Sequence, residues 1–479
     1  YLITDSVWQE ARDAMGYQSV PHTPLMLTLG GQPYIDVRAS FNSFLPANLP
    51  TPIRTKLVNA WLDRLEAHPE FHDKVEFDIA QTIVDFNFGD DYIDRYRGVL
   101  ESGEYQEYQQ ALTQITEVNL STSPKSSLAV ALAEVEQLET IQENWGESPL
   151  DGQLDQLSVL LDECRDLGTR PFSIIARHAF IAETLLRSAV SRDALSADRL
   201  ETFKRSLNTV TSDFTQEFST ALLQPETRAA FLVKYGHLRP GTYDITSPRY
   251  DQREDLFDAK GEGSLVVKAV AFELTTVESN ALGRMFDASG MRMVKPAAFI
   301  TYARLAISNR ERAKFIFTRH LSRALELIAT WGEAKELTRD DLARLTVTDL
   351  LDELVTPVLN DPEIHFKDLI GQRRREHEQV NGIRLGYLIR DPRDLYVVPL
   401  HRSAPNFVTQ ERIEGIPLKL DNQARANEVL RGRIICIENA DPGFDWIFTR
   451  NIAGLVSKYG GANSHMTIRC AELGLPAAI

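Results

Sequence analysis

The sequence has few cysteines, no excess of basic residues and no long apolar run. Its three cysteines, Cys164, Cys436 and Cys470, are odd in number and far apart, which excludes a disulfide framework and is typical of a reducing compartment. Acidic residues outnumber basic ones by 68 to 52, giving a formal charge of −16, whereas a nucleic-acid binder needs a basic face. No apolar run approaches the ~20 residues of a spanning helix. We therefore expect a cytoplasmic protein without nucleic-acid or membrane partners.

Two kinds of functional motif are also missing. The phosphate-binding pattern G-x-x-x-x-G-K-[ST] does not occur, and His377-Glu378 lacks the second histidine of a zinc-binding helix. We therefore predict no metal site in this chain. The sequence opens at Tyr1 without a methionine and stops at Ile479 in what reads as a strand, so we expect a fragment of a longer protein.

The chain is long enough for two to four domains, and its apolar periodicity changes along the sequence. Residues 1–90 read as mixed α/β, and the alternation at 75–79 predicts a half-buried strand. Residues 91–395 read as packed helices, with apolar stripes such as Leu128, Leu132, Val135, Leu138 and Ile141. A proline-containing linker follows at 396–417.

Residues 418–479 have the pattern of a small α/β domain. Strands are predicted at 433–437 and 453–456, then a helix at 464–473 and a new strand from 475. The expected fold is thus multidomain and mostly α with α+β parts: a large helical central domain followed by a partial β/β/α domain.

The segment 459–465 is the most informative chemically. Gly460 and Gly461 allow a tight turn after a strand, and Asn463 or Ser464 can cap the helix that follows. His465 then lies at a helix N-terminus, where free N–H groups and the helix dipole attract anions. Because a neutral imidazole is an effective nucleophile toward phosphorus, His465 is a candidate phosphoryl carrier.

The wider string GGANSHMTIRCAELGLPAAI resembles the signature of the phosphohistidine swivelling domain of PEP-utilising enzymes. The family includes pyruvate phosphate dikinase, phosphoenolpyruvate synthase and rifampin phosphotransferase. The resemblance is carried by Gly460, Gly461, Ser464, His465, Ile468, Glu472, Leu473, Gly474 and Pro476. It implies that His465 is catalytic and that Gly460, Gly461, Asn463, Ser464 and Arg469 support the phosphoryl group.

This sequence departs from the family pattern at two positions. Asn463 stands where the family usually has threonine, so control by phosphorylation of that hydroxyl is not available. Ala471 stands where the family has arginine, and Arg469, on a different helix face, is an imperfect replacement.

Residues 235–250, YGHLRPGTYDITSPRY, resemble a segment in the central domain of rifampin phosphotransferase-like proteins, and the stretch around Asn309-Arg310 is similar to its following helix. The resemblance implies a small-molecule acceptor bound by the helical domain. His237, Arg239, Arg249 and Arg310 are the candidate acceptor-binding residues, because loop residues and guanidinium groups suit such a site. His237 is a candidate general base.

The family resemblance implies an ATP-dependent, dikinase-type phosphotransferase. ATP and Mg²⁺ are expected on the protein's own ATP-grasp domain, which is not in this sequence, and ATP yields AMP and phosphate in the rifampin-type family. Two alternatives stay open. One is a phosphoenolpyruvate synthase-like enzyme with a C-terminal pyruvate/PEP barrel outside this chain, and the other is a non-catalytic helical module with a degenerate carrier domain.

Overall fold

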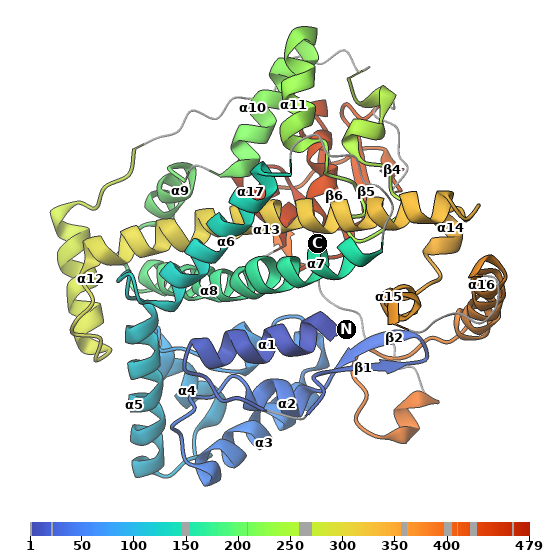
Figure 1. The fold of residues 1–479 in the computed structure, drawn as a ribbon. Coiled ribbons are helices and arrows are strands. Elements are labelled where there is room, and N and C mark those ends of the chain that lie inside the picture. The colour runs from blue at the N-terminus through green and yellow to red at the C-terminus, as the bar shows by residue number, and fades with distance from the viewer. Residues whose placement is uncertain are drawn as a thin grey trace.

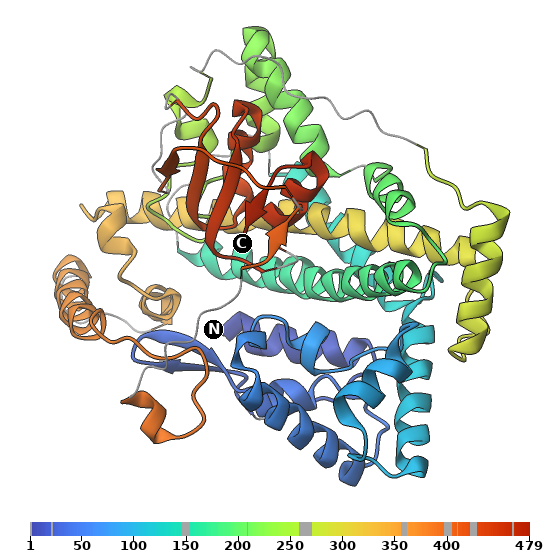
Figure 2. The ribbon, with the colours of Figure 1, turned by 180° about the vertical axis from the view of Figure 1, so that it is seen from behind.

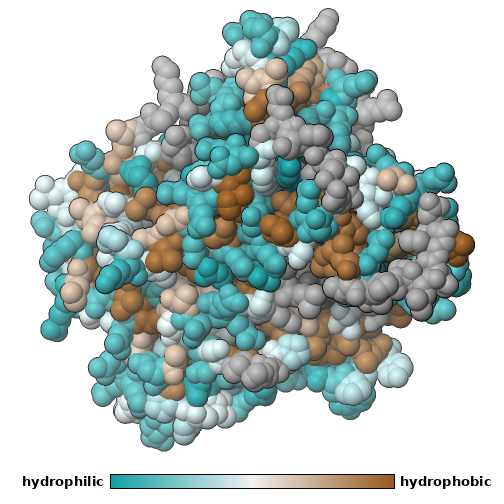
Figure 3. Space-filling model, viewed as in Figure 1, coloured by the Kyte–Doolittle hydropathy of each residue, from teal (hydrophilic) through white to brown (hydrophobic). Residues whose placement is uncertain are grey.

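A computed structural model describes residues 2–20, 23–145, 154–207, 209–257, 271–355, 362–396, 405–409, 411–421, 429–461 and 464–479. The long helix α13 (Pro296–Glu333) crosses the middle of the molecule (Figure 1). The N-terminal segment lies on one side of it and a small C-terminal domain on another (Figure 2). On the face seen in Figure 3, apolar side chains form scattered patches between polar ones.

The N-terminal segment is mainly helical, with one antiparallel hairpin formed by β1 (Met26–Leu29) and β2 (Gln32–Ile35). Its helices are α1 (Leu2–Ala14), α2 (Val37–Asn42), α3 (Thr51–Ala67), α4 (Phe88–Tyr96) and α5 (Ser102–Asn119). The strand predicted at 75–79 is wrong: Val75–Ile79 is a π-helical turn, η2. Alternating apolar and polar residues do not by themselves provide a partner strand. The segment instead forms a backbone hydrogen bond within the turn, from Ala80 N to Val75 O at 2.7 Å.

The central helices form the large helical domain that the sequence predicts. The helix α8 (Arg170–Ser191) packs along α13. The π-helical turn before it, Cys164–Thr169, also approaches α13, and Gly168 permits this because a Cβ there would lie 2.7 Å from the Phe317 Cβ. The other α-helices in the described ranges are α6 (Ser127–Glu143), α7 (Asp155–Glu163), α9 (Ala197–Arg205), α10 (Val210–Leu223), α11 (Arg228–Tyr235), α12 (Thr276–Ala288), α14 (Arg339–Leu342), α15 (Val347–Val355) and α16 (Pro362–Val380). Within these ranges, no helix combines the length and apolar character needed to cross a bilayer.

The small domain is the predicted α/β unit at the C-terminus. Its sheet has the order β3-β7-β6-β5-β4, and every pair is parallel except β3 with β7. The strands are β3 (Phe407–Val408), β4 (Pro417–Lys419), β5 (Ile434–Asn439), β6 (Gly454–Tyr459) and β7 (Ala477–Ala478), with helix α17 (His465–Leu473) before β7. The strand β3 and the first residue of β4 lie in the range 396–417 that the sequence suggested as a linker.

The small domain shares one hydrophobic core with α10 and α11. Aromatic side chains of these helices (Phe214, Phe218, Phe231 and Tyr235) join a cluster that includes Phe444, Trp446, Phe448 and Met466 of the small domain. The backbones also approach closely, since a Cβ on Gly443 would lie 1.8 Å from the Arg239 carbonyl oxygen. The small domain is therefore docked on the helical domain.

Candidate functional site

His465 is the first residue of α17, at the turn that follows β6. Ser464 is the N-cap, and its hydroxyl accepts a hydrogen bond from Thr467 N at 3.3 Å. Gly460 lies where a side chain has no room, because a Cβ would be 2.5 Å from Ile479 Cγ2, whereas the space beside Gly461 is open. The predicted residue Asn463 lies outside the described residues.

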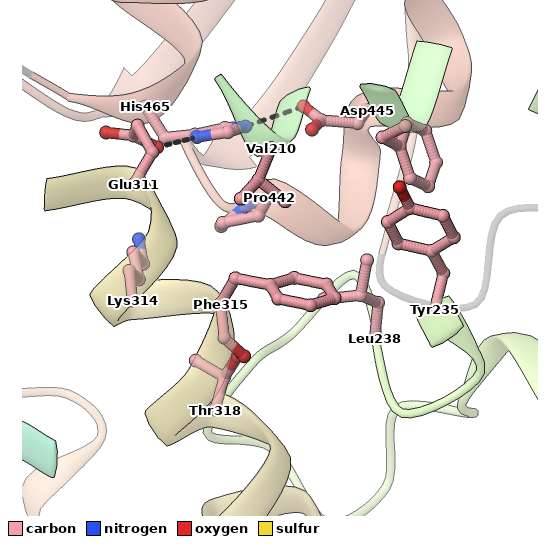
Figure 4. Close-up of a pocket in the computed structure, with 11 residues that line it drawn as sticks. Val210, Tyr235, Leu238, Glu311, Lys314, Phe315, Thr318, Pro442, Asp445 and His465 are labelled. Carbon is pink, nitrogen blue, oxygen red and sulfur yellow. Dashed lines mark hydrogen bonds and ion pairs between the residues drawn. The ribbon is translucent and has the colours of Figure 1, made fainter. Parts of the chain in front are cut away.

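The ring of His465 is held by one carboxylate from each domain. Its Nδ1 lies 2.7 Å from Glu311 Oε2 on α13, and its Nε2 lies 2.7 Å from Asp445 Oδ1 in the segment η8 (Pro442–Arg450) of the small domain (Figure 4). His465 is 6% exposed. The imidazole therefore lies at the interface of the two domains, with both nitrogens engaged.

The two carboxylates favour the protonated ring. Burial lowers the pKa of His465, but the charge of Asp445 and the hydrogen bonds to Asp445 and Glu311 outweigh it and raise the pKa to about 9. Burial likewise raises the pKa of Glu311, yet the hydrogen bond and charge of His465 hold that pKa below its ordinary value. At neutral pH the docked ring is an imidazolium that donates from both nitrogens. An imidazolium has no free lone pair, so the docked ring is not a nucleophile.

A small pocket adjoins the ring. Its volume of about 30 Å³ has room for about two water molecules. Apolar residues form most of its wall (Val210, Phe214, Leu238, Phe315 and Pro442), together with Tyr235, Lys314 and Thr318 (Figure 4). Lys314 lies one turn after Glu311 on α13, is half-buried, and forms no ion pair with the residues that the structure describes. It places a positive charge beside His465.

Of the predicted arginines, Arg310 pairs with a carboxylate that contacts the ring. Its guanidinium pairs with Glu311 Oε1 at 3.2 Å, while Glu311 Oε2 faces His465. Arg469 instead donates to Thr215 Oγ1 on α10 at 2.6 Å, and it does not line the pocket at His465. Within the described structure, Arg469 therefore contacts the domain interface beside α10.

The three candidates in the 235–250 loop pack along α13, away from the pocket lining. Arg239 is buried and pairs with Glu326 at 2.9 Å, and Arg249 donates to Asp251 at 2.9 Å. The ring of His237 packs edge-on against Phe315, with centroids 4.9 Å apart, and both its nitrogens are buried without a hydrogen-bond partner among the described residues. Burial lowers the pKa of His237 well below its ordinary value, so this ring is neutral.

Two carboxylates of the site were not found from the sequence, Glu311 and Asp445. Glu311 is next to Arg310, but in that stretch only basic side chains, Lys314 among them, were predicted to face a phosphoryl group. The position of Glu311 one turn before Lys314 on a helix was the available signal. Asp445 had no such signal, because its pairing with His465 depends on how η8 packs against α17.

One family model matches the part of the chain that contains His465. Residues 429–479 match the family model described as PEP-utilising enzyme, mobile domain. The match covers β5, η8, β6, α17 and β7, and confirms the resemblance to PEP-utilising enzymes in this part of the chain. No curated protein matches the chain. The segment is called the mobile domain below, and the assignment to a particular subfamily stays a prediction.

Proposed function

We propose that this chain is the central and carrier part of an ATP-dependent phosphotransferase of the dikinase type. In this proposal His465 carries a phosphoryl group to a small-molecule acceptor on the helical domain. The main support is the position of His465: it belongs to the segment that matches a mobile domain, and it reaches α13 of the helical domain.

The phosphoryl donor in this proposal is ATP with Mg²⁺. We assign both to an ATP-grasp domain outside this chain. Within the described ranges, no group of three or more histidine, cysteine, aspartate or glutamate side chains could hold a metal ion. Bound there, ATP supplies the phosphoryl group, and the residues of this chain receive and transfer it.

The proposed chemistry consists of two displacements at phosphorus. In the first, neutral His465 attacks the phosphorus, an N–P bond forms and the bond to the leaving oxygen breaks. In the second, an acceptor hydroxyl attacks the phosphorus and the N–P bond breaks. Glu311 takes the hydroxyl proton and passes it to the released imidazole, which yields an imidazolium–carboxylate pair of the kind found here. Lys314 neutralises phosphoryl oxygens during this step.

The docked arrangement fits the carrier in its unloaded form. Carboxylate oxygens lie 2.7 Å from both ring nitrogens, so a phosphoryl group on either nitrogen needs a carboxylate to move away. The pocket also has no room for an acceptor beyond a few waters. Loading of His465 and binding of the acceptor therefore require the mobile domain to separate from α13.

Replacement of the carrier tests the proposal. The protein containing this chain is incubated with β- or γ-labelled ATP and examined for acid-labile, base-stable label. We expect His465→Asn to abolish the label and the transfer while the circular dichroism of the helical domain is unchanged. His68→Asn, a partly exposed surface histidine, is the matched control and should keep both. Transfer retained in His465→Asn would refute the assignment.

The family description gives a specific reason to keep a second candidate, a phosphoenolpyruvate synthase-like enzyme. In that case His465 exchanges its phosphoryl group with PEP on a barrel domain outside this chain. Labelled PEP then labels His465 in the intact protein. A protein that takes label from neither ATP nor PEP is instead the non-catalytic module, an alternative consistent with the clamped ring and with Ala471.

A further inference from the structure

Two neighbouring arginines on helix α13, Arg319 and Arg323, contact a backbone carbonyl and an aromatic ring. Arg319 and Arg323 are one turn apart and therefore share a face. Arg319 donates to the Lys234 carbonyl at 2.8 Å, and the Arg323 guanidinium lies 4.6 Å from the Trp145 ring centroid. Neither forms an ion pair with any residue in the described ranges, although acidic residues exceed basic ones in the whole chain.

The loop before and after residue 240 brings a third arginine to this face, Arg249, which pairs with Asp251 of the same loop. Ser322 Oγ donates to the His237 carbonyl at 2.9 Å, and Gln252 Nε2 donates to Glu326 Oε2 at 2.7 Å, so the loop runs along α13 beside both arginines. Arg249 belongs to this loop. Burial lowers the pKa of Arg323, and the nearby positive charge of Arg249 lowers it further. Three guanidinium groups thus gather on one face of α13.

A cavity of about 420 Å³ opens beside Arg323. Asn144 and Gln156 supply amide groups to its wall, and Ile141 and Leu160 supply apolar surface. Among the described residues that line it, the one carboxylate is that of Glu163, which interacts with His320 Nε2 at 3.1 Å and forms no ion pair with Arg323. A concave, partly apolar site with a few convergent polar groups is the usual form of a small-molecule site, and the volume lies in the usual range.

We propose that this cavity binds an organic anion, a carboxylate or phosphate ester with a compact apolar body. Arg323 binds the acidic group, Arg319 raises the positive potential beside it, and the apolar wall receives the body of the ligand. Twelve residues separate Glu311 from Arg323 on α13, which is about 18 Å along the helix axis. The cavity is therefore a site separate from His465, and the inference does not depend on the carrier function.

Calorimetric titration of this chain tests the inference. The probes are 2-naphthoate and phenyl phosphate, which separate the two acidic groups, and neutral 2-naphthylmethanol. We expect at least one anion to bind, and the neutral alcohol to bind about tenfold more weakly or not at all. Binding of the alcohol as tight as that of the naphthoate, or no binding of either anion, would overturn the inference.

Variants on the same helix locate the binding site. Arg323→Gln should weaken anion binding about tenfold or more, and Arg323→Lys, which keeps the charge, should lose less. Arg312→Gln is the matched control because Arg312 is on α13 but pairs with Glu139. Thermal unfolding of each variant checks that it folds. Unchanged affinity in a folded Arg323→Gln, or an equal loss in Arg312→Gln, would contradict the assignment.

Discussion

At the scale of single residues, the protonation of His465 controls how firmly the mobile domain is held. The pKa of His465 is raised from 6.5 to about 9, although burial opposes the rise, because Asp445 and Glu311 favour the charged ring. A raised pKa gives stability that is complete below the unfolded value and is lost as pH rises through the folded value. We therefore expect the docked state to weaken between about pH 6.5 and 9.

Histidine NMR titration measures this directly. Wild-type His465 should titrate near 9, and Glu311→Gln should lower that pKa because one of the two carboxylates is removed. Urea unfolding at about pH 6.5 and about pH 9 should show a lower free energy of unfolding at the higher pH. A wild-type ring that titrates at its ordinary value would contradict the clamped geometry.

Gly443 is a residue at which the backbones of the two domains approach closely. In Gly443→Ala the new Cβ would lie 1.8 Å from the Arg239 carbonyl oxygen, and a backbone atom cannot move aside as a flexible side chain can. We expect Gly443→Ala to lower the free energy of unfolding by about 3 kcal/mol, the upper end of the range of about 1–3 kcal/mol typical of overpacking. Urea unfolding measures this loss.

The matched control is Gly103→Ala on α5, where a Cβ has no heavy atom within 4 Å. Limited proteolysis should then cut the Gly443→Ala protein between its domains faster than the control. Equal stability and equal cleavage of the two variants would show that Gly443 does not limit docking.

The residue scale also shows what the sequence can reveal about the site. His465 and its cap Ser464 could be predicted because the motif is local: two glycines, a capping residue and a histidine follow one another. Glu311 could not be predicted, since it is 154 residues from His465 in the sequence and contacts it only because the two domains are docked. Asp445 is 20 residues away and depends on the packing of η8.

At the scale of secondary-structure elements, the predictable ones have strong periodicity and clear ends. The stripe from Leu128 to Ile141 is α6, and the strands and helix predicted at 433–473 are β5, β6 and α17. The strand prediction for residues 75–79 was wrong because alternating polarity in a short segment does not specify a partner strand. The strands β3 and β4 are too short to carry a pattern of their own.

The helix α10 joins the mobile domain to the helical domain. Phe218 on α10 is fully buried, and its ring lies 5.6 Å from that of Phe214 and 5.3 Å from that of Phe231. We expect Phe218→Ala to lower the free energy of unfolding by about 3–5 kcal/mol, because the cavity left behind adds to the lost burial.

Val233→Ala on the neighbouring helix α11 is the control for this element. Val233 is 83% exposed, so its truncation should change the free energy of unfolding by less than about 0.5 kcal/mol. Urea unfolding of both variants provides the comparison. A small effect of Phe218→Ala would show that the shared core contributes little to docking.

At the scale of the whole molecule, the main conclusion is that this chain is in a closed arrangement. The mobile domain shares a core with α10 and α11 and is linked to α13 through His465 and Glu311. A phosphoryl group adds a charge of about −2 and bulk at a ring whose nitrogens face two carboxylates. Phosphorylation should therefore open the molecule.

Small-angle X-ray scattering measures this change. We expect the radius of gyration of the protein to rise when His465 is phosphorylated and to return when the label is hydrolysed. His465→Asn treated with the same donor should show no change. An unchanged radius in fully phosphorylated protein would mean that the carboxylates rearrange locally while the domains stay docked.

The central claim is that His465 carries a phosphoryl group, and peptide mapping of the labelled protein tests it most directly. After incubation of the intact protein with ATP and Mg²⁺, mass spectrometry at neutral to alkaline pH should place one added phosphoryl group on His465. Phosphoryl groups found only on other residues, or none from either ATP or PEP, would contradict the account.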